Sequence, residues 1–218
     1  MKKFFYLMLA SCLTGSLVSC DDESTVIENP VVGPNLLVYG LTTSNQLVKF
    51  NANKPETFTS TISITGVGAN EKLMSIDFRP ATGELYAVSD ASKIYAINAN
   101  TAAARAIGST AFSPTISGSI ASIDFNPTVD RIRLVTNTGQ NLRLNPETGA
   151  VAFTDGSVAT TASVAGVAYT NSRSGATSTT LYDIDATSGK LFKQDPPNNG
   201  TLVEVGSLGM TFTGQAAF

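Results

Sequence analysis

The sequence predicts an all-β fold built like a β-propeller, and three observations predict it. A unit of short, apolar-patterned strands and tight turns fills residues 123–156, and weaker copies of it lie on both sides. The copy before it starts at Ile76, 47 residues ahead of Ile123, and a period of about 40–50 residues with four strands per repeat is typical of propeller blades. Charged residues make up only 14% of the chain, whereas small polar residues that favour turns are abundant.

The central unit is predicted to be a four-stranded antiparallel meander. Ile123–Phe125 alternates apolar and acidic side chains, as a strand does, and Pro127 ends this strand because proline has no N–H for the ladder. Further strands are expected over Arg131–Val135, Gln140–Asn145 and Ala150–Thr154. The connections between them are short, which requires antiparallel neighbours.

The other copies are less complete. The N-terminal copy resembles only a second and a third strand, and the C-terminal residues Gln215–Phe218 resemble a first strand with nothing after it. If that last strand completes the first blade, the ring has four blades; otherwise it has five, and the last one is missing from this chain. The strands expected in these copies are Leu37–Leu41, Gln46–Asn51, Ile76–Phe78, Leu85–Val88, Ile94–Asn98, Val167–Tyr169, Thr180–Ile184 and Lys190–Lys193.

The N-terminal residues are predicted to be a signal and a tether. Met1–Lys3 is basic, and Phe4–Leu17 is apolar but too short to span a bilayer, as in the core of a signal peptide. Leu17–Cys20 resembles a bacterial lipobox, in which the cysteine becomes the acylated N-terminus. The expected organisation is therefore a lipoprotein signal peptide over residues 1–19, an acylated cysteine with its tether over residues 20–34, and one domain over residues 35–218.

An acidic run, Asp21, Asp22 and Glu23, follows the cysteine directly. It is similar to the export signal that sends lipoproteins of Bacteroidetes-type bacteria to the cell surface; the simpler interpretation is a solvated tether. We expect a lipid-anchored protein of the bacterial outer membrane, exposed at the cell surface if the run is an export signal. Loss of Lys2 and Lys3 with the signal peptide leaves 12 basic and 17 acidic side chains, a formal charge of −5. Nucleic acid is therefore not an expected partner.

The chain from about Asn35 to its end resembles a bacterial family catalogued as domain of unknown function 4394. The resemblance implies a secreted or surface protein with a repeated, propeller-like β architecture, and it implies no catalytic residues. Members of that family usually continue through another blade past the position of Phe218. The segments that carry the resemblance are Tyr39–Thr43, Ile76–Gly83, Asp124–Pro146 and Thr180–Asp185.

The sequence lacks the residues of several common active sites. It has no His and no Trp, and Cys12 lies inside the signal peptide, so Cys20 is the only thiol position of the mature chain. A Ser-His-Asp or Cys-His arrangement and a His-ligated zinc site are therefore excluded. We expect no cofactor and no metal. Glycoside hydrolysis needs only two carboxylates across a cleft, so an enzyme stays an alternative.

Two carboxylates are candidate ligand-binding residues. Asp77 and Asp124 occupy equivalent positions in first strands, which line the central channel of a propeller. There they could hold a cation through oxygen ligands. The alternative is that each accepts hydrogen bonds from neighbouring backbone or arginine groups, and the third copy has Ala168 at this position.

A basic cluster forms a second group of candidates, to which the neighbouring Asp130 belongs. Arg131, Arg133 and Arg143 lie on two adjacent predicted strands, and the first two must share a strand face. Guanidinium groups suit the carboxylates or sulfates of an acidic sugar or peptide. The alternative is a structural network in which the arginines pair with the nearby acids Asp124, Asp130 and Glu147.

Taken together, these features favour a non-enzymatic binding or interaction module on the cell envelope. Its expected partners are the membrane, through the lipid anchor, and a glycan, peptide or protein ligand, and we expect a monomer. One alternative is a carboxylate-dependent envelope hydrolase or lyase acting on glycans. Another is a structural or adhesive surface protein without a small ligand.

Overall fold

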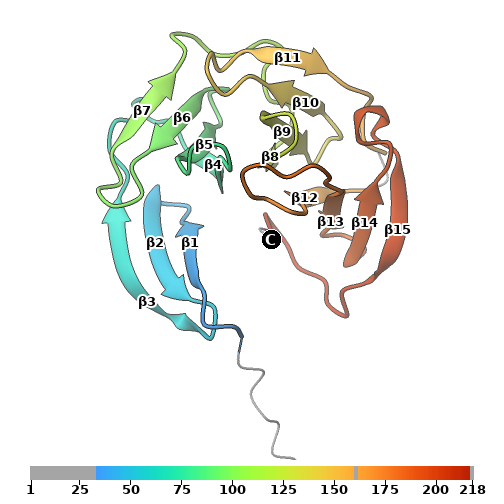
Figure 1. Ribbon diagram of the computed structural model, residues 1–218, viewed down its shortest axis with the longest axis horizontal. Coiled ribbons are helices and arrows are strands. Elements are labelled where there is room, and N and C mark those ends of the chain that lie inside the picture. Colours follow the sequence, from blue (N-terminus) through green and yellow to red (C-terminus); the bar gives the residue numbers. More distant parts are fainter. Residues whose placement is uncertain (1–32, 160–161, 217–218) are drawn as a thin grey trace, which may run out of the picture. The chain divides into compact units, whose positions relative to one another are not determined.

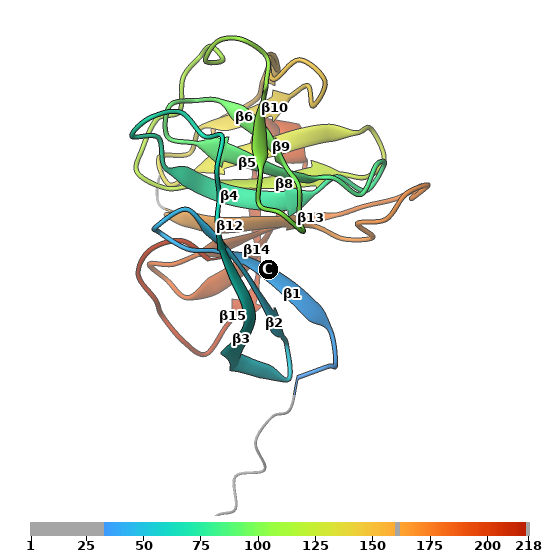
Figure 2. The same cartoon turned by 90° about the vertical axis from the view of Figure 1, so that its left-hand side faces the viewer.

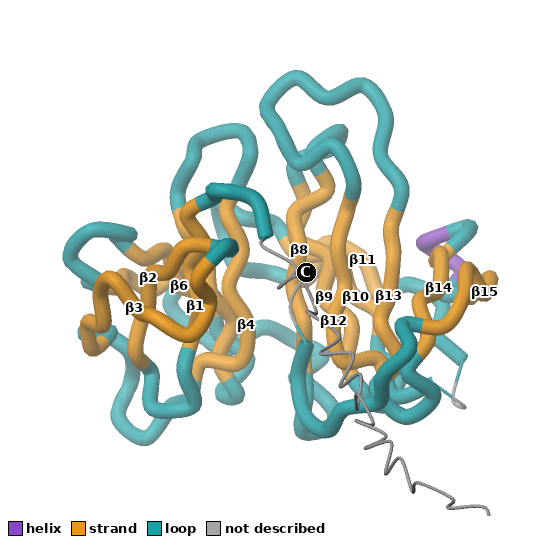
Figure 3. The backbone as a smooth tube through the Cα atoms, turned by 90° about the horizontal axis from the view of Figure 1, so that it is seen from below, coloured by secondary structure: helices purple, strands orange, loops and turns teal. Residues whose placement is uncertain are grey.

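The computed structural model describes residues 33–159 and 162–216. Within them the chain forms four antiparallel sheets that follow one another around a common centre, as the blades of a propeller do (Figure 1). We call the sheets blades 1 to 4 in chain order. The predicted all-β, propeller-like fold is confirmed, and the described residues contain one helical element, the 3-10 turn Pro197–Asn199 (Figure 3). The predictions made for Cys20, Asp21, Asp22 and Glu23 lie outside the described residues.

Each blade is a meander in which strands adjacent in sequence are also hydrogen-bonded neighbours. The strands of blade 1 are β1 (Leu37–Leu41), β2 (Gln46–Asn51) and β3 (Lys54–Ser63). Those of blade 2 are β4 (Leu73–Phe78), β5 (Leu85–Ser89), β6 (Ile94–Ile97) and β7 (Ala104–Ile107). Those of blade 3 are β8 (Ala121–Asn126), β9 (Arg131–Thr136), β10 (Asn141–Leu144) and β11 (Val151–Thr154). Those of blade 4 are β12 (Val164–Tyr169), β13 (Leu181–Asp185), β14 (Lys190–Gln194) and β15 (Leu202–Ser207).

In blades 2 to 4 the first strand lies nearest the centre and the last strand lies at the rim (Figure 1). The inner strands were predictable because most of their side chains are buried, which requires apolar residues. The rim strands β3, β7 and β15 were not predicted. Most of their side chains are exposed, so no buried face imposes an alternating apolar pattern on them.

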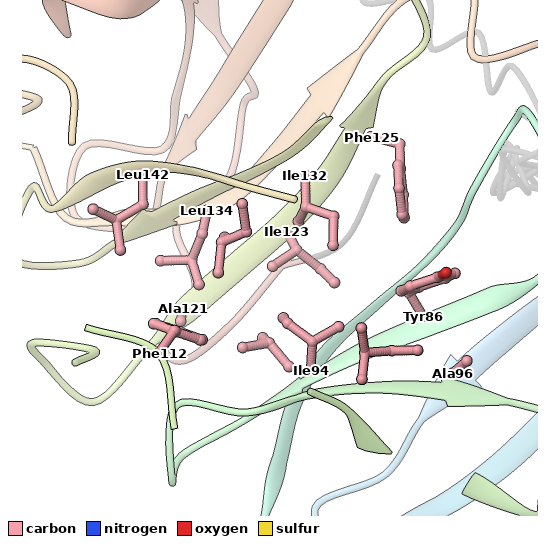
Figure 4. Packing of buried hydrophobic residues seen from close by; sticks show 13 residues of the cluster. Tyr86, Ile94, Ala96, Phe112, Ala121, Ile123, Phe125, Ile132, Leu134 and Leu142 are labelled. Carbon is pink, nitrogen blue, oxygen red and sulfur yellow. The ribbon is translucent and has the colours of Figure 1, made fainter. Parts of the chain in front are cut away.

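Hydrophobic side chains fill the interfaces between successive blades. The interface between blades 2 and 3 is built from Tyr86 and Val88 on one side and from Ile132 and Leu134 on the other, with the Tyr86 and Phe125 rings edge to face at 5.1 Å (Figure 4). A second cluster, which includes Leu47 and Leu85, joins blades 1 and 2. A third, which includes Val135, Val167 and Leu181, joins blades 3 and 4. Tyr39, Tyr86 and Tyr95 lie in or against these clusters.

The last described residues return to the centre beside β12 (Figure 1). Gln215 and Ala216 do not form a strand there, but the Ala216 N–H donates a hydrogen bond to the Ala165 carbonyl at 3.0 Å. Gly166 makes this approach possible, because a Cβ at Gly166 would lie only 2.7 Å from the Ala216 carbonyl oxygen. Gln215 and Ala216, the described part of the segment predicted to be a first strand, thus lie against β12, the first strand of blade 4.

Candidate functional site

The inner strands of blades 2 and 3 are joined by side chains that accept backbone hydrogen bonds. The inner edge of β8 has no neighbouring strand, so its outward N–H groups need other acceptors. Ser75 Oγ accepts the Ile123 N–H at 3.1 Å, and Asp77 Oδ2 accepts the Phe125 N–H at 2.7 Å. Asp77 therefore acts here as a backbone acceptor between two blades.

Blades 3 and 4 repeat this arrangement one blade further along. Ser122 Oγ accepts the Val167 N–H at 3.1 Å, and Asp124 Oδ1 accepts the Tyr169 N–H at 2.9 Å. Of the two roles considered for Asp77 and Asp124, the geometry places both in hydrogen bonds to the neighbouring backbone. We call Asp77 and Asp124 the axial carboxylates.

The axial carboxylates titrate far from their ordinary range. Burial raises the pKa of Asp77 to about 7, although the N–H groups of Phe125 and Phe78 oppose the shift. Burial, and then repulsion from Asp77, raise the pKa of Asp124 to about 9, against the hydrogen bond from Tyr169. Two like charges near one another in an apolar setting cannot both ionise readily. The pair therefore carries at least one proton at neutral pH.

Arg133 is only 2% exposed and lies between blades 3 and 4. Its Nη1 donates to Asn141 Oδ1 at 2.8 Å and forms an ion pair with Asp155 at 2.5 Å. Its Nη2 donates to Asn198 Oδ1 at 2.7 Å, and its Nε donates to the Tyr169 hydroxyl at 3.2 Å. This set of partners fits a structural role, since a ligand could reach little of the guanidinium.

Arg143 shares the Asp155 carboxylate with Arg133. The Arg143 Nε and Nη2 atoms lie 2.7 and 2.8 Å from the two Asp155 oxygens, a two-pronged geometry that suits a carboxylate. The guanidinium also stacks over the Phe153 ring, with 4.0 Å to its centre. Asp155 was not among the acids predicted to pair with these arginines. It lies just after β11, and the folded blade brings it to the side chains of β9 and β10.

Asp130 lies in a different network, between blades 2 and 3. Both of its carboxylate oxygens accept hydrogen bonds from Arg79, which also pairs with Glu147 and donates to the Tyr86 hydroxyl. Asp130 takes a left-handed backbone conformation, with φ 49°, which aspartate tolerates better than most residues. Arg131 donates to the Asp130 carbonyl at 2.9 Å. The predicted basic cluster is therefore divided between two interfaces.

The open pockets of the molecule lie elsewhere. In these antiparallel blades, the connections from one blade to the next and the turns between second and third strands emerge at the same end of the sheets. We call this end the connection face. The opposite face carries the connection between β12 and β13, residues 170–180, which extends beyond the sheets (Figure 2).

A first pocket of about 740 Å³ opens on the connection face between blades 1 and 2. Its acid is Glu71, whose carboxylate accepts hydrogen bonds from Lys93 Nζ at 2.5 Å, Tyr95 Oη at 2.7 Å and Ser89 Oγ at 3.0 Å. Burial alone would raise the pKa of Glu71, but these donors, Lys93 first, outweigh it and lower the pKa. A carboxylate held ionised in this way is a poor general acid.

A second pocket on the connection face, of about 690 Å³, has no ionisable side chain in its lining. One aromatic ring, Phe212, lies among hydroxyl-bearing residues. The pocket is formed by the starts of β8 and β12, the turn after β13 and the C-terminal segment, that is, by Ile120, Ser163, Ala186, Thr187, Thr211, Phe212, Thr213 and Gly214. We call this lining the hydroxyl pocket.

The chemistry available in the pockets is thus hydrogen bonding and apolar contact. On the opposite face a pocket of about 540 Å³ contains Glu84, which is paired with Arg105 at 2.9 Å. Across residues 33–159 and 162–216, no group of three or more Asp, Glu, Cys or His side chains is arranged to hold a metal ion. The described part of the chain also has no helix long and apolar enough to cross a membrane.

The chain is similar in sequence to one family and in fold to solved structures. The family model described as "Domain of unknown function (DUF4394)" matches residues 46–218. A crystal structure of a structural genomics protein of unknown function from Bacteroides thetaiotaomicron is similar over 84% of this chain and 51% of its own, with 15% identity and a TM-score of 0.55. A structure of BBS1N in complex with ARL6DN, soaked with mercury, matches 79% of this chain and 50% of its own, with 11% identity and a TM-score of 0.45. The chain spans about half the length of these two structures, and no curated protein matches it.

Proposed function

The chain belongs to the family of the Domain of unknown function (DUF4394), and from this premise we propose that it is an envelope lipoprotein that binds a neutral, hydroxyl-rich ligand such as a glycan. Cys20 would carry the lipid anchor, and Asp21, Asp22 and Glu23 would direct the protein to the outer face of the outer membrane. The domain would then present its connection face to ligands outside the cell.

The observation that carries this proposal is the composition of the hydroxyl pocket. Phe212 offers an apolar ring against which a sugar face can pack, and Ser163, Thr187 and Thr213 offer hydroxyls that both donate and accept. A lining without charge favours a ligand without charge, because a charged group would lose its hydration without gaining a partner. A few polar groups around an apolar contact are typical of small-ligand sites.

Binding is favoured over catalysis because the acids near the pockets are already paired. Glu71 is held by Lys93, and Glu84 is held by Arg105. Glycoside hydrolysis requires two carboxyl groups placed across the bond to be cleaved. The pockets on both faces offer a single, neutralised acid or none.

A second candidate, a carboxylate-dependent hydrolase or lyase, is supported by one observation. The pKa values of the axial carboxylates, about 7 for Asp77 and about 9 for Asp124, are raised by burial and by mutual repulsion. Carboxyl groups with separated pKa values are a feature of acid–base sites. Both groups, however, already accept the backbone N–H groups of Phe125 and Tyr169, which favours the binding proposal.

The test is a titration of the chain with two matched panels of oligosaccharides, one neutral and one containing uronic acids, followed by calorimetry. We expect the neutral panel to bind and Phe212→Ala to weaken binding about tenfold, equivalent to about 1.4 kcal/mol for an aromatic contact. Phe58→Ala is the matched control, because Phe58 is 55% exposed and lies on the rim strand β3 of blade 1. No residue of blade 1 lines the hydroxyl pocket. Equal binding of both panels, or an equal loss in both variants, would remove the hydroxyl pocket as the site. Release of shortened products would favour the hydrolase.

A further inference from the structure

The interface between blades 3 and 4 differs from the other two at one position. The paired strands place Asp183 opposite Val167, as Ala87 lies opposite Ile76 and Leu134 opposite Ile123. Asp183 therefore occupies a position at which blades 2 and 3 carry buried apolar residues. An acid at a site that the repeat otherwise fills with a hydrocarbon side chain calls for a specific partner.

The Asp183 side chain is fully buried and has no hydrogen-bond partner within the described part of the chain. The same is true of one other buried atom there, Gln194 Oε1, whose residue is 1% exposed. Asp183 is opposite Phe192 in the β13–β14 ladder, so Asp183 and Gln194 point to the same face of blade 4. Three buried acceptor oxygens on one face of blade 4 thus lack donors within the described part of the chain.

Arg133 of blade 3 is the charged group that acts on Asp183. Arg133 lowers the pKa of Asp183, whereas burial, the larger effect, raises it to about 7. Tyr169, which contacts Arg133, lies opposite Leu181, on the same face as Asp183. A guanidinium has five N–H donors, and four of those of Arg133 are used by Tyr169, Asn141, Asp155 and Asn198. One N–H of Arg133 therefore remains, and it forms no ion pair with Asp183.

We propose that this interface encloses a hydration site, in which one or two buried water molecules join the Asp183 carboxylate and Gln194 Oε1 to the remaining N–H of Arg133. A water molecule supplies two donors, which three orphan acceptors need, and it also accepts the hydrogen bond that Arg133 still offers. The result is a water-mediated ion pair between blades 3 and 4.

The charges at this interface favour water over a bound cation. Arg133 acts on Asp183, and the other titratable groups of the Arg133 network are Arg143, Asp155 and Tyr169. Two guanidinium groups and two carboxylates balance only when Asp183 is ionised and no further charge is present. A metal cation or an ammonium ion would leave a net positive charge buried between the blades, which is costly.

The test compares the melting temperatures of the full chain, Asp183→Leu and Asp183→Asn. Asp183→Leu gives blade 4 the residue that blade 3 has at this position, Leu134. If water completes the ion pair, the leucine leaves Arg133 and Arg143 to share the single carboxylate of Asp155. The melting temperature then falls by roughly 5 °C or more, with asparagine in between. If Asp183 is dry and unpartnered, leucine raises the melting temperature, and the proposal is overturned.

A second measurement tests the proposal even if Asp183→Leu does not fold. A long-lived water near the Val167 methyl groups should appear as a water-to-protein nuclear Overhauser effect in the parent chain and be lost in Asp183→Asn or shifted in it. Absence of that signal in the parent overturns the proposal. Melting in potassium, sodium and calcium chloride, compared with choline chloride at equal ionic strength, should give the same temperatures. A melting temperature raised by one cation in the parent but not in Asp183→Asn would mean that the site holds that cation instead of water.

Discussion

Asp124 accepts the backbone N–H of Tyr169 at 2.9 Å across the boundary between blades 3 and 4. The contact repeats the one between Asp77 and Phe125 a blade earlier, at 2.7 Å. In both cases a side chain of one inner strand completes the hydrogen bonding of the next inner strand, which has no strand partner on that side. The carboxyl groups that look like a ligand site in the sequence are thus part of the structure that joins the blades.

The axial carboxylates should make the protein less stable as pH rises. Their folded pKa values, about 7 for Asp77 and about 9 for Asp124, lie above the ordinary value of 3.8. The folded state therefore holds protons that the unfolded state releases, and the stabilisation is lost as pH rises through this window. We expect the melting temperature to fall between pH 5 and pH 9. Asp124→Asn, which keeps an acceptor for Tyr169, should flatten the profile, whereas Asp90→Asn at an exposed backbone acceptor should not. A flat profile in the parent chain would contradict this prediction.

Arg133 is expected to be structural. Its replacement by alanine removes four hydrogen bonds and half of the positive charge around Asp155, which for a buried ion pair costs about 3–5 kcal/mol. Arg105→Ala is the matched control, because Arg105 pairs with Glu84 at the surface and such pairs contribute about 0–1 kcal/mol. Urea titration of the three proteins measures the difference. Equal midpoints would show that Arg133 is not needed for folding, and the arginines would again be candidates for an acidic ligand.

The repeats made the fold predictable, whereas most of the site depended on contacts between blades. The Ile-Asp-Phe pattern of Ile123–Phe125 recurs at Ile76–Phe78, so the sequence showed this inner strand and its copy. The rim strands β3 and β15 have mostly exposed side chains, and strands of this kind leave little pattern. The pairing of Arg133 with Asp155 required knowing which turn folds over which strand. The hydroxyl pocket combines Ser163 with Phe212 from segments far apart in the chain, so no local motif could reveal it.

Gly166 should be intolerant of a side chain, although its backbone conformation is ordinary. A Cβ at this position would meet the Ala216 carbonyl at 2.7 Å and the Ala216 carbonyl carbon at 3.1 Å, and backbone yields little. We expect Gly166→Ala to cost about 1–3 kcal/mol, as overpacking does. Gly206→Ala, where a Cβ has nothing within 4 Å, should change stability by less than about 0.5 kcal/mol. If the two variants unfold alike, the contact between Ala216 and β12 does not contribute to stability.

Cys20 is predicted to carry the membrane anchor. Cys20→Ala should move the protein from the membrane fraction to the soluble fraction of the expressing cell and abolish metabolic labelling with a fatty acid. Cys12→Ala is the matched control, since Cys12 lies in the predicted signal peptide and should leave both readouts unchanged. Continued labelling of the Cys20 variant would count against acylation at this position.

The acidic run is predicted to decide which side of the outer membrane the domain faces. Changing Asp21, Asp22 and Glu23 together to alanine should protect the domain from protease added to intact cells, in a host of the Bacteroidetes type. Fatty-acid labelling should be unaffected, which separates export from anchoring. Unchanged protease sensitivity would mean that the run is only a tether.

The side-chain acceptors Ser75, Asp77, Ser122 and Asp124 have a consequence for assembly as well as for stability. In both joints the earlier inner strand, β4 or β8, offers the oxygen acceptors, and the later one, β8 or β12, supplies the N–H donors. The contact between two blades is therefore directional. Two surfaces that both carry acceptors, or both carry donors, could not form these hydrogen bonds. Because the acceptors precede the donors in the chain, we expect each blade to dock on the blade that was synthesised before it. At β12, where Gly166 and Ala168 replace serine and aspartate, backbone contact takes over this role.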